Sequence, residues 1–510
     1  MKRKNQNPHI FPDDLRHPPS YLPNLHAPAR RMILDHMSAA EESPRISLLL
    51  VTVGITVFMA SLDLAMVAIS LPSLARDLGI SSMAASWVMM ASLLVPCSFL
   101  VVFLRLGERK GFRFIFAAGC LVFAAASLLC GIAVDTGMLI GSRLLLGVGA
   151  SMSAGLAMAV VVGRTSDSGL RKGPVIIAVS FALGFVLGPV LGSFITTSLS
   201  WHGIFFVSLP LAVAGFFLAL RFVPKNPLPG PKVDYPGGFL ILFAVLGFVL
   251  FLTEGLVRGF TSPLVLTSLV VFILACILFI QRERSTENPV FPPRLFRSRT
   301  FSLANLAALL VMMAFSGALV TLPFYLEYIQ GLSLIASGLM LTIPPAAMLV
   351  SGLLSKTFSD RTGPRGPSAF SAVILCLGFL LLARAGATGG DAFLYGGLVL
   401  LGLGVGGFVS TGTVQVLSLF RPDETGPVST LMLTIRNIGL ILGVAVSSAV
   451  LVAVVRMGAA PLPVFIADVS PALLLDAFRV AFLTGALLSL LAFVSVMATR
   501  KSRRGPGAGK

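Results

Sequence analysis

The segment Leu106–Phe114 reads LGERKGFRF, with three basic residues and one acid in a short turn between two long apolar runs. The rest of the chain avoids charge, because 56% of its 510 residues are hydrophobic and only 12% are charged. Soluble domains carry about 25% charged residues. The mean hydropathy of +0.94 agrees with a chain that lies mostly in lipid. The composition indicates a polytopic membrane protein, and the charged segment is where the chain turns at the membrane surface.

The apolar runs on either side of this turn belong to a series that extends from Ile46 to Met497. There are fourteen of them, each near the ~20 residues that a helix needs to cross a bilayer. The sequence therefore predicts an all-α membrane protein with fourteen transmembrane helices.

The net charge of +17 is divided unevenly between the two sides of the membrane. Most Lys and Arg residues fall in the two tails and in loops on the same side as the tails, which the positive-inside rule assigns to the cytoplasm. We therefore expect a multi-pass protein of the cell (inner) membrane, surrounded by the lipid bilayer, with both termini cytoplasmic. This distribution argues against nucleic acid as a partner. The few basic residues expected on the outer side are Arg76, Arg258, Arg384, Arg456 and Arg479.

The remaining polar features give no sign of a bound metal or cofactor. All five cysteines lie in apolar runs, where a thiol behaves as a small hydrophobe, so we expect no disulfides. Residues 1–44 hold four of the five histidines, spaced too loosely for a zinc motif, and we expect a disordered cytoplasmic tail. Gly402–Gly407, GLGVGG, fits G-x-G-x-x-G, but no strand precedes it and helix packing explains it better. We expect no cofactor and no enzymatic activity.

A second charged turn, SDRTG at Ser359–Gly363, repeats the order acid, Arg, any residue, Gly that begins at Glu108. Gly107 and Gly111 are expected to allow the first of these tight turns. If each turn follows the second helix of a six-helix half, the chain consists of two parallel repeats with two helices inserted between them. Parallel repeats are an architecture of transporters, with the substrate site near the midplane between the halves.

The predicted organisation has five parts. They are the tail (1–44), the N-terminal six-helix half (45–222), the two inserted helices with flanking cytoplasmic loops (223–299), the C-terminal six-helix half (300–499) and a basic cytoplasmic tail (500–510).

These turns resemble the loop signature of the major facilitator superfamily, Gly-x-Leu-Ala-Asp-Arg-x-Gly-Arg-Lys, and specifically its fourteen-helix branch of drug:proton antiporters. Leu106, Arg109, Gly111 and Arg113 match, whereas Leu104, Glu108 and Phe112 replace Gly, Asp and Arg. The resemblance implies a conformational latch, in which Glu108 holds Arg residues of neighbouring helix ends in the outward-facing state. The alternative is a simple topology anchor. The expected latch residues are Gly107, Glu108, Arg109, Gly111 and Arg113, with Asp360, Arg361 and Gly363 in the second half.

GFVLGPVLGS, Gly184–Ser193, resembles the antiporter signature Gly-x-x-x-Gly-Pro-x-x-Gly-Gly of that branch, with Gly184, Gly188, Pro189 and Gly192 in place. Glycines four apart let another helix approach closely, and a proline inside a helix removes a backbone hydrogen bond. The resemblance implies export rather than import. The alternative is ordinary small-residue packing.

SLDLAMVAISLPSLARDLG, Ser61–Gly79, resembles the first-helix signature of the branch and places Asp63 near the middle of a membrane helix. An acid there is a functional candidate, so we expect Asp63 to couple transport to protons or to attract cations. The alternative is a structural ion pair. Ala65 and Ala68 stand where the family usually has Thr and Asn, which favours an apolar cavity.

Three further charged residues lie in the apolar runs. Two of them match signatures of the family, and one of these needs an acid as a partner. Arg143 matches an Arg-x-x-x-Gly signature, and burying it is costly enough that Asp63 is its expected partner. The resemblance implies that Arg143 tunes the protonation of a nearby acid. Glu327, near the outer end of its run, is either a second proton-coupling or cation-attracting group or simply solvated. Arg436 matches an Arg-x-x-Gly stretch, and we expect a gating or packing role.

The sequence therefore predicts a proton-coupled exporter of small hydrophobic or cationic organic compounds, which works by alternating access and uses small-molecule substrates and protons. A periplasmic adaptor protein is a possible further partner. Two alternatives remain open. One is a dedicated transporter of a metabolite such as an amino acid, siderophore or organic acid. The other is a membrane receptor that transports nothing.

Overall fold

The computed structural model describes residues 27–162, 167–225, 232–287, 289–386, 390–420, 425–458 and 468–499. Within these ranges the chain consists of helices joined by short turns, without strands. Fourteen helical segments are long and apolar enough to cross a membrane, which confirms the predicted number and the all-α fold.

The first six candidate spans form the N-terminal half and the last six form the C-terminal half. The N-terminal helices are α1 (Ala27–Asp77), α2 (Ser82–Lys110), α3 (Phe112–Gly131), α4 (Thr136–Met152), α5 (Ala157–Val162), α6 (Asp167–Ser198) and α7 (Gly203–Phe222), with a 3-10 turn, η2 (Ala154–Leu156), joining α4 and α5 into one span. The next two spans are α8 (Tyr235–Arg258) and α9 (Pro263–Ser285). The C-terminal helices are α10 (Pro293–Phe296), α11 (Arg299–Tyr328), α12 (Leu334–Met340), α13 (Ile343–Thr362), α14 (Arg365–Arg384), α15 (Gly390–Leu417), α16 (Thr425–Gly458) and α17 (Pro471–Met497), where α12 and α13 share one span.

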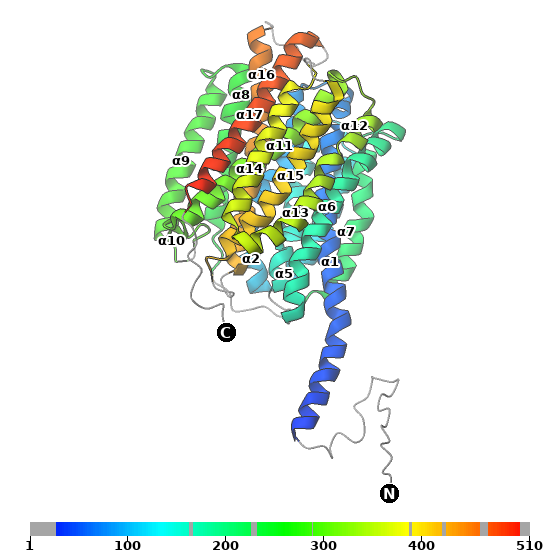
Figure 1. Cartoon of the computed structure of the whole chain (residues 1–510), viewed down its shortest axis with the longest axis vertical. Coiled ribbons are helices and arrows are strands. Elements are labelled where there is room, and N and C mark those ends of the chain that lie inside the picture. Colours follow the sequence, from blue (N-terminus) through cyan, green and yellow to red (C-terminus); the bar gives the residue numbers. More distant parts are fainter. Residues whose placement is uncertain are drawn as a thin grey trace.

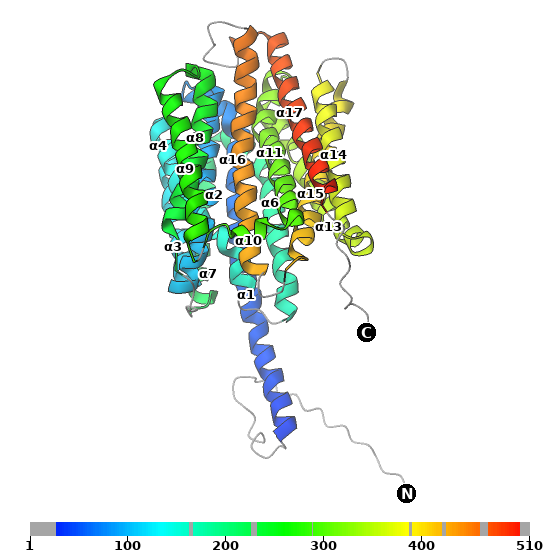
Figure 2. The same ribbon diagram turned by 90° about the vertical axis from the view of Figure 1, so that its left-hand side faces the viewer.

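The helices pack into one bundle whose two ends can be named from α1 and α17 (Figures 1 and 2). The tail end is where α1 enters the bundle at Ile46 and where α17 finishes at Met497. The far end is where α1 finishes at Asp77. Side-chain caps start several helices, because Ser81, Asp135 and Ser298 each accept a hydrogen bond from the backbone N–H three residues on.

The two charged turns have the same backbone geometry. Gly111 ends α2 with φ +93°, and its N–H donates to the Gly107 carbonyl. Gly363 ends α13 with φ +81°, and its N–H donates to the Ser359 carbonyl. A positive φ favours glycine at both places. The expectation that Gly107 also turns the chain is wrong: it lies in the last turn of α2, where a Cβ would come within 2.8 Å of the Phe112 ring.

The helix α1 begins earlier than the sequence composition predicts. Residues 1–26 of the expected disordered tail lie outside the described residues, but the structure has helix from Ala27 onward. Figure 1 shows this part of α1 projecting away from the bundle at the tail end. Extending an existing helix adds one hydrogen bond for each residue fixed, without a new nucleation step, which is why a polar segment joined to a membrane helix can continue it.

The helices α8 and α9 lie side by side at one edge of the bundle (Figures 1 and 2). Phe239 of α8 packs edge-on against Phe99 of α2, with ring centroids 5.0 Å apart. At the far end, Arg456 of α16 donates to the Leu256 carbonyl of α8 with 2.6 Å between N and O. The helix α8 therefore contacts both six-helix halves.

The helix α6 lies against α1 with almost no space between the backbones. A Cβ added at Gly184 would lie 2.7 Å from the Phe58 carbonyl oxygen, and one at Gly192 would lie 2.9 Å from the Met66 Cα. Gly188, between them, meets the same helix. The glycines of the Gly184–Ser193 segment thus set the distance between α1 and α6, as their spacing predicts.

We expect Gly184→Val to lower the stability of the protein, because the added side chain has to push α6 away from α1. Overpacking of this kind costs about 1–3 kcal/mol. Gly141→Val is the matched control, since nothing lies within 4 Å of a Cβ at that helical position. The measurement is the thermal midpoint of the purified protein in detergent. Equal midpoints for the two variants would contradict the close-packing role of Gly184.

Candidate functional site

The charges at Asp63 and Arg143 form an ion pair inside the N-terminal half. Arg143 Nη1 of α4 donates to Asp63 Oδ2 of α1 at 2.6 Å. The two residues are 0% and 3% exposed, respectively. The structure therefore confirms Asp63 as the partner that the sequence predicts for Arg143, and it places the pair away from solvent.

Arg143 is also anchored to α2. Its Nε donates to the Val88 carbonyl at 3.1 Å, and its Nη2 donates to Ser92 Oγ at 2.8 Å. The Phe205 ring of α7 lies 5.8 Å from the guanidinium carbon. One side chain thereby joins α1, α2 and α4. Sequence reasoning missed Ser92, because a serine in an apolar helix ordinarily bonds only to its own backbone, as Ser92 also does with Met89.

The Asp63 carboxylate is only half satisfied. Oδ2 receives the Arg143 hydrogen bond, whereas Oδ1 is buried and has no hydrogen-bond partner among the described residues. A buried carboxylate oxygen without a donor is costly. Among the described residues, Oδ1 is thus the Asp63 atom that the contact with Arg143 leaves without a partner.

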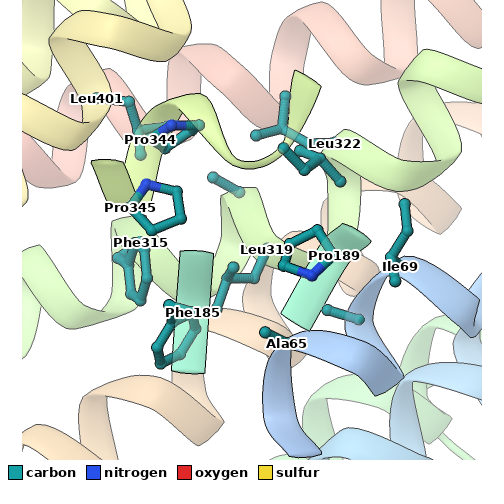
Figure 3. Close-up of a pocket in the computed structure, with 13 residues that line it drawn as sticks. Ala65, Ile69, Phe185, Pro189, Phe315, Leu319, Leu322, Pro344, Pro345 and Leu401 are labelled. Atoms are coloured by element: carbon teal, nitrogen blue, oxygen red, sulfur yellow. The ribbon is translucent and has the colours of Figure 1, made fainter. Parts of the chain in front are cut away.

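A separate apolar cavity of about 30 Å³ lies between the two halves (Figure 3). The N-terminal half contributes Ala65, Ala68 and Ile69 from α1 and Phe185 and Pro189 from α6. The C-terminal half contributes the other lining residues: Phe315, Ala318, Leu319 and Leu322 of α11, Leu341, Pro344 and Pro345 around the start of α13, and Leu401 of α15. The two alanines that replace the family's polar residues therefore line an apolar cavity, as predicted from the sequence.

Asp63 does not face this cavity. In an α-helix, residues three or four apart share a face, so Ala65, Ala68 and Ile69 form one stripe of α1. Asp63 precedes Ala65 by two positions and lies on the other side of the helix, toward α4, where Arg143 meets it. Neither Asp63 nor Arg143 is among the residues that line the cavity. The ion pair and the cavity are thus on opposite faces of one helix.

The far end of the bundle is closed by contacts between the halves. Arg76 at the end of α1 forms an ion pair with Glu327 at the end of α11. Arg76 also bonds to Ser73 of its own helix and to the Tyr328 hydroxyl. Glu327 is thus neither a cavity residue nor a freely solvated one in this structure, because it is the C-terminal half's part of a bridge.

A second contact between the halves lies deeper in the bundle. Ser448 Oγ of α16 donates to Ser86 Oγ of α2 at 2.8 Å, and both side chains are buried. On the other flank, α12 packs against α6, where a Cβ added at Gly338 would lie 2.6 Å from the Pro189 carbonyl oxygen. These contacts hold the N-terminal and C-terminal halves together near the far end, on both sides of the cavity.

The expected latch at the tail end is only partly visible. Glu108 forms its ion pair with Arg105, three residues earlier in the same helix, at 3.0 Å. Arg113, at the start of α3, donates to the Val223 carbonyl just after α7. The side chains of Asp360 and Arg361 lie outside the described residues. In this structure Glu108 therefore holds no residue of a neighbouring helix among those described.

Arg436 of α16 contacts the neighbouring helix α15. Its Nη2 donates to Thr413 Oγ1 at 2.7 Å, and it also lies 3.5 Å from the Val409 carbonyl oxygen. These bonds tie α15 to α16 within the C-terminal half. The contacts agree with a packing role, and they do not reach the cavity lining.

Comparisons with known proteins agree on one family. The family model described as Major Facilitator Superfamily matches residues 53–444. The riboflavin transporter RibZ of Clostridioides difficile is 28% identical over 78% of this chain and 86% of its own. The multidrug transporter protein MdtP of Bacillus subtilis is 26% identical over 81% of this chain and 77% of its own. The crystal structure of a POT family transporter in complex with 5-aminolevulinic acid has a similar fold, with a TM-score of 0.64, 16% identity and coverage of 88% and 95%.

We expect Arg143→Leu to be far more damaging to folding than the double variant Asp63→Asn/Arg143→Leu. The single change leaves a buried carboxylate without its cation, which costs about 3–5 kcal/mol, whereas the double change leaves no charge behind. The measurement for each variant is the fraction of folded protein, taken as the fraction that elutes as a single species in detergent. Arg258→Leu is the control, because its partner Glu254 lies in the last turn of α8, where the exposed pair is worth little. Equal yields for the single and double variants would mean that the pair does not stabilise the fold.

Proposed function

The chain belongs to the major facilitator superfamily and is a membrane transporter, and from this premise we propose that it exports small organic compounds in exchange for protons. The substrate occupies the cavity between the halves, which alternately opens at either end of the bundle. The tail end is cytoplasmic in this proposal, because the basic tails and loops gather there. The protein then sits in the cell membrane with the far end outside.

The observation that carries the proposal is the half-satisfied carboxylate of Asp63, next to a cavity it does not enter. A proton on Oδ1 neutralises Asp63 and weakens its hold on Arg143. Arg143 stays attached to α2 through Val88 and Ser92, so the bond that loosens is the one that joins α1 to α4. Protonation therefore loosens α1 from α4.

The helix α1 connects this event to both substrate and gate. It carries Asp63 on one face, Ala65, Ala68 and Ile69 on the cavity face, and Arg76 at its far end. At 1.5 Å per residue, Arg76 lies roughly 10 Å along the axis beyond Ile69. A small shift of α1 thus changes the cavity wall and the bridge to Glu327 together. Bound substrate and bound proton favour different positions of one helix, which is sufficient for exchange.

In this proposal, the two charged turns form the gate at the tail end of the bundle. When the far end opens, the tail ends of the halves close, and Glu108 comes within reach of basic groups on neighbouring helix ends. Gly111 and Gly363 supply the sharp turns on which α2 and α13 end in each half. In the far-closed arrangement described above, Glu108 pairs within its own helix, as a released latch does.

The energy available is adequate for export. One charge that crosses 100 mV carries about 2.3 kcal/mol. Since about 1.4 kcal/mol corresponds to a factor of ten, one proton sustains a gradient of roughly fortyfold.

A second candidate is a dedicated metabolite transporter on the same scaffold. Similarity to a riboflavin transporter favours it, and similarity to multidrug transporters favours a broad exporter. A panel of unrelated apolar compounds, added to inverted membrane vesicles that hold a proton gradient, separates the two. Collapse of the gradient by several unrelated compounds supports the broad exporter, and a response to one metabolite alone supports the dedicated transporter. A separate adaptor protein is a further partner to test by co-purification.

We expect Asp63→Asn to insert and fold with reduced stability, because Arg143 keeps its charge without a counter-ion, and to lose substrate-driven proton exchange. The amide keeps a hydrogen-bond acceptor for Arg143 but cannot take up the proton. The assay is the recovery of a pH-sensitive dye in inverted vesicles, with Glu254→Gln as the control, because that acid pairs with Arg258 at a helix end. Undiminished exchange in Asp63→Asn would remove this residue from the coupling mechanism.

We expect the bridge between Arg76 and Glu327 to act as the far-end gate. Arg76→Glu and Glu327→Arg each place like charges at the contact, so each should slow transport, by about tenfold or more for a repulsion near 1.4 kcal/mol. The double variant restores opposite charges and should recover most of the activity. If the double variant is as slow as either single one, the ion pair itself is not the gate.

A further inference from the structure

We propose that the compounds this protein carries are uncharged, and that it selects them against cations and anions of the same shape. The inference rests on the proposed function and deepens it, because it chooses between the hydrophobic and the cationic substrates that the sequence leaves open. It starts from the distribution of charge around the cavity between the halves.

The cavity wall offers no charge to a ligand. Its lining consists of alanine, isoleucine, leucine, phenylalanine and proline side chains. Figure 3 shows that the only nitrogen atoms among the side chains drawn are those of the proline rings. An ion that enters such a space gives up its hydration and gains neither a counter-charge nor a hydrogen-bond partner of comparable strength.

The acid nearest to the cavity along α1 cannot serve as that counter-charge. Asp63 faces the other side of the helix, and Arg143 already neutralises it at 2.6 Å. The charges beyond the cavity at the far end, Arg76 and Glu327, also neutralise one another. Both of these pairs are therefore already occupied within the protein.

Cations have one other possible partner, the faces of aromatic rings. Phe185 of α6 and Phe315 of α11 face the cavity from opposite halves, with ring centroids 5.7 Å apart and planes inclined by 56°. Phenylalanine is a weaker cation acceptor than tryptophan, and its attraction offsets only part of the hydration an ion loses. The same rings are well suited to a neutral aromatic compound, which loses little hydration and gains stacking contacts.

The charge of the substrate also decides how transport responds to voltage. Exchange of one neutral molecule for one proton moves one net charge across the membrane in each cycle. Exchange of a monovalent cation for one proton moves none. A neutral substrate therefore predicts that membrane potential alone, without a pH difference, drives transport.

The test uses three probes with one ring system, at a pH where acridine is unprotonated. They are neutral acridine, the permanent cation 10-methylacridinium and the anion acridine-9-carboxylate. Binding to the purified full-length protein is measured by equilibrium dialysis, and current is measured on proteoliposomes against protein-free liposomes. We expect acridine to bind at least tenfold more tightly than either ion and to give a current driven by voltage alone.

A gain-of-function variant sharpens this test. Ala68→Asp places a carboxylate in the cavity wall and should raise the affinity for 10-methylacridinium at least tenfold, whereas the nearly isosteric Ala68→Asn should not. Leu319→Asp and Leu319→Asn, on the opposite half, repeat the comparison if the first pair folds poorly. Failure of both carboxylates to favour the cation would count against a cavity that discriminates by charge.

The remaining outcomes separate the two proposals. Wild-type binding of 10-methylacridinium as tight as that of acridine overturns the charge selectivity and leaves the exporter intact. If none of the three probes and no compound of the panel binds or is exchanged for protons, both proposals are overturned.

Discussion

The buried ion pair between Asp63 and Arg143 is the interaction on which the N-terminal half depends. Two charges in the middle of a membrane are tolerated only with their partners in place. Arg143 meets this requirement by reaching α1 and α2 at once, through Asp63, the Val88 carbonyl and Ser92. The relative positions of three helices are therefore tied to the contacts of one arginine side chain.

The close packing of α6 on α1 extends this connection toward the C-terminal half. Because Gly184 and Gly192 leave no side chain between the two backbones, α1 cannot shift without α6. The helix α6 in turn touches α12 of the other half near Gly338, and Pro189 lies at once in the cavity wall and at this contact. The ion pair, the cavity and the contact between the halves thus share one closely packed pair of helices.

Much of this arrangement could be predicted from the sequence, and the rest depends on contacts between distant residues. Apolar runs of the right length locate the fourteen spans, and the cost of a buried arginine identifies Asp63 as its partner. The alanines at 65 and 68 predict an apolar cavity. No local pattern indicates that Ser92 binds Arg143, that Arg76 reaches Glu327, or that Glu108 pairs with Arg105, since each depends on which helices become neighbours and in which state of the transporter. Gly107 could not be interpreted from the sequence for a related reason. Glycine occurs both in tight turns and where helices or side chains pack closely, and Gly107 proved to be a packing position.

The position of α8 makes the two flanks of the bundle unequal. On one flank, α2 and α16 meet, and α8 lies against both through Phe239 and Leu256. On the other flank, α6 meets α12 and α13 with no such additional helix among the described residues. The helix α8 therefore covers the seam between the halves on the first flank. Among the described residues, the seam on the second flank has no such cover and is the one exposed to the surrounding lipid.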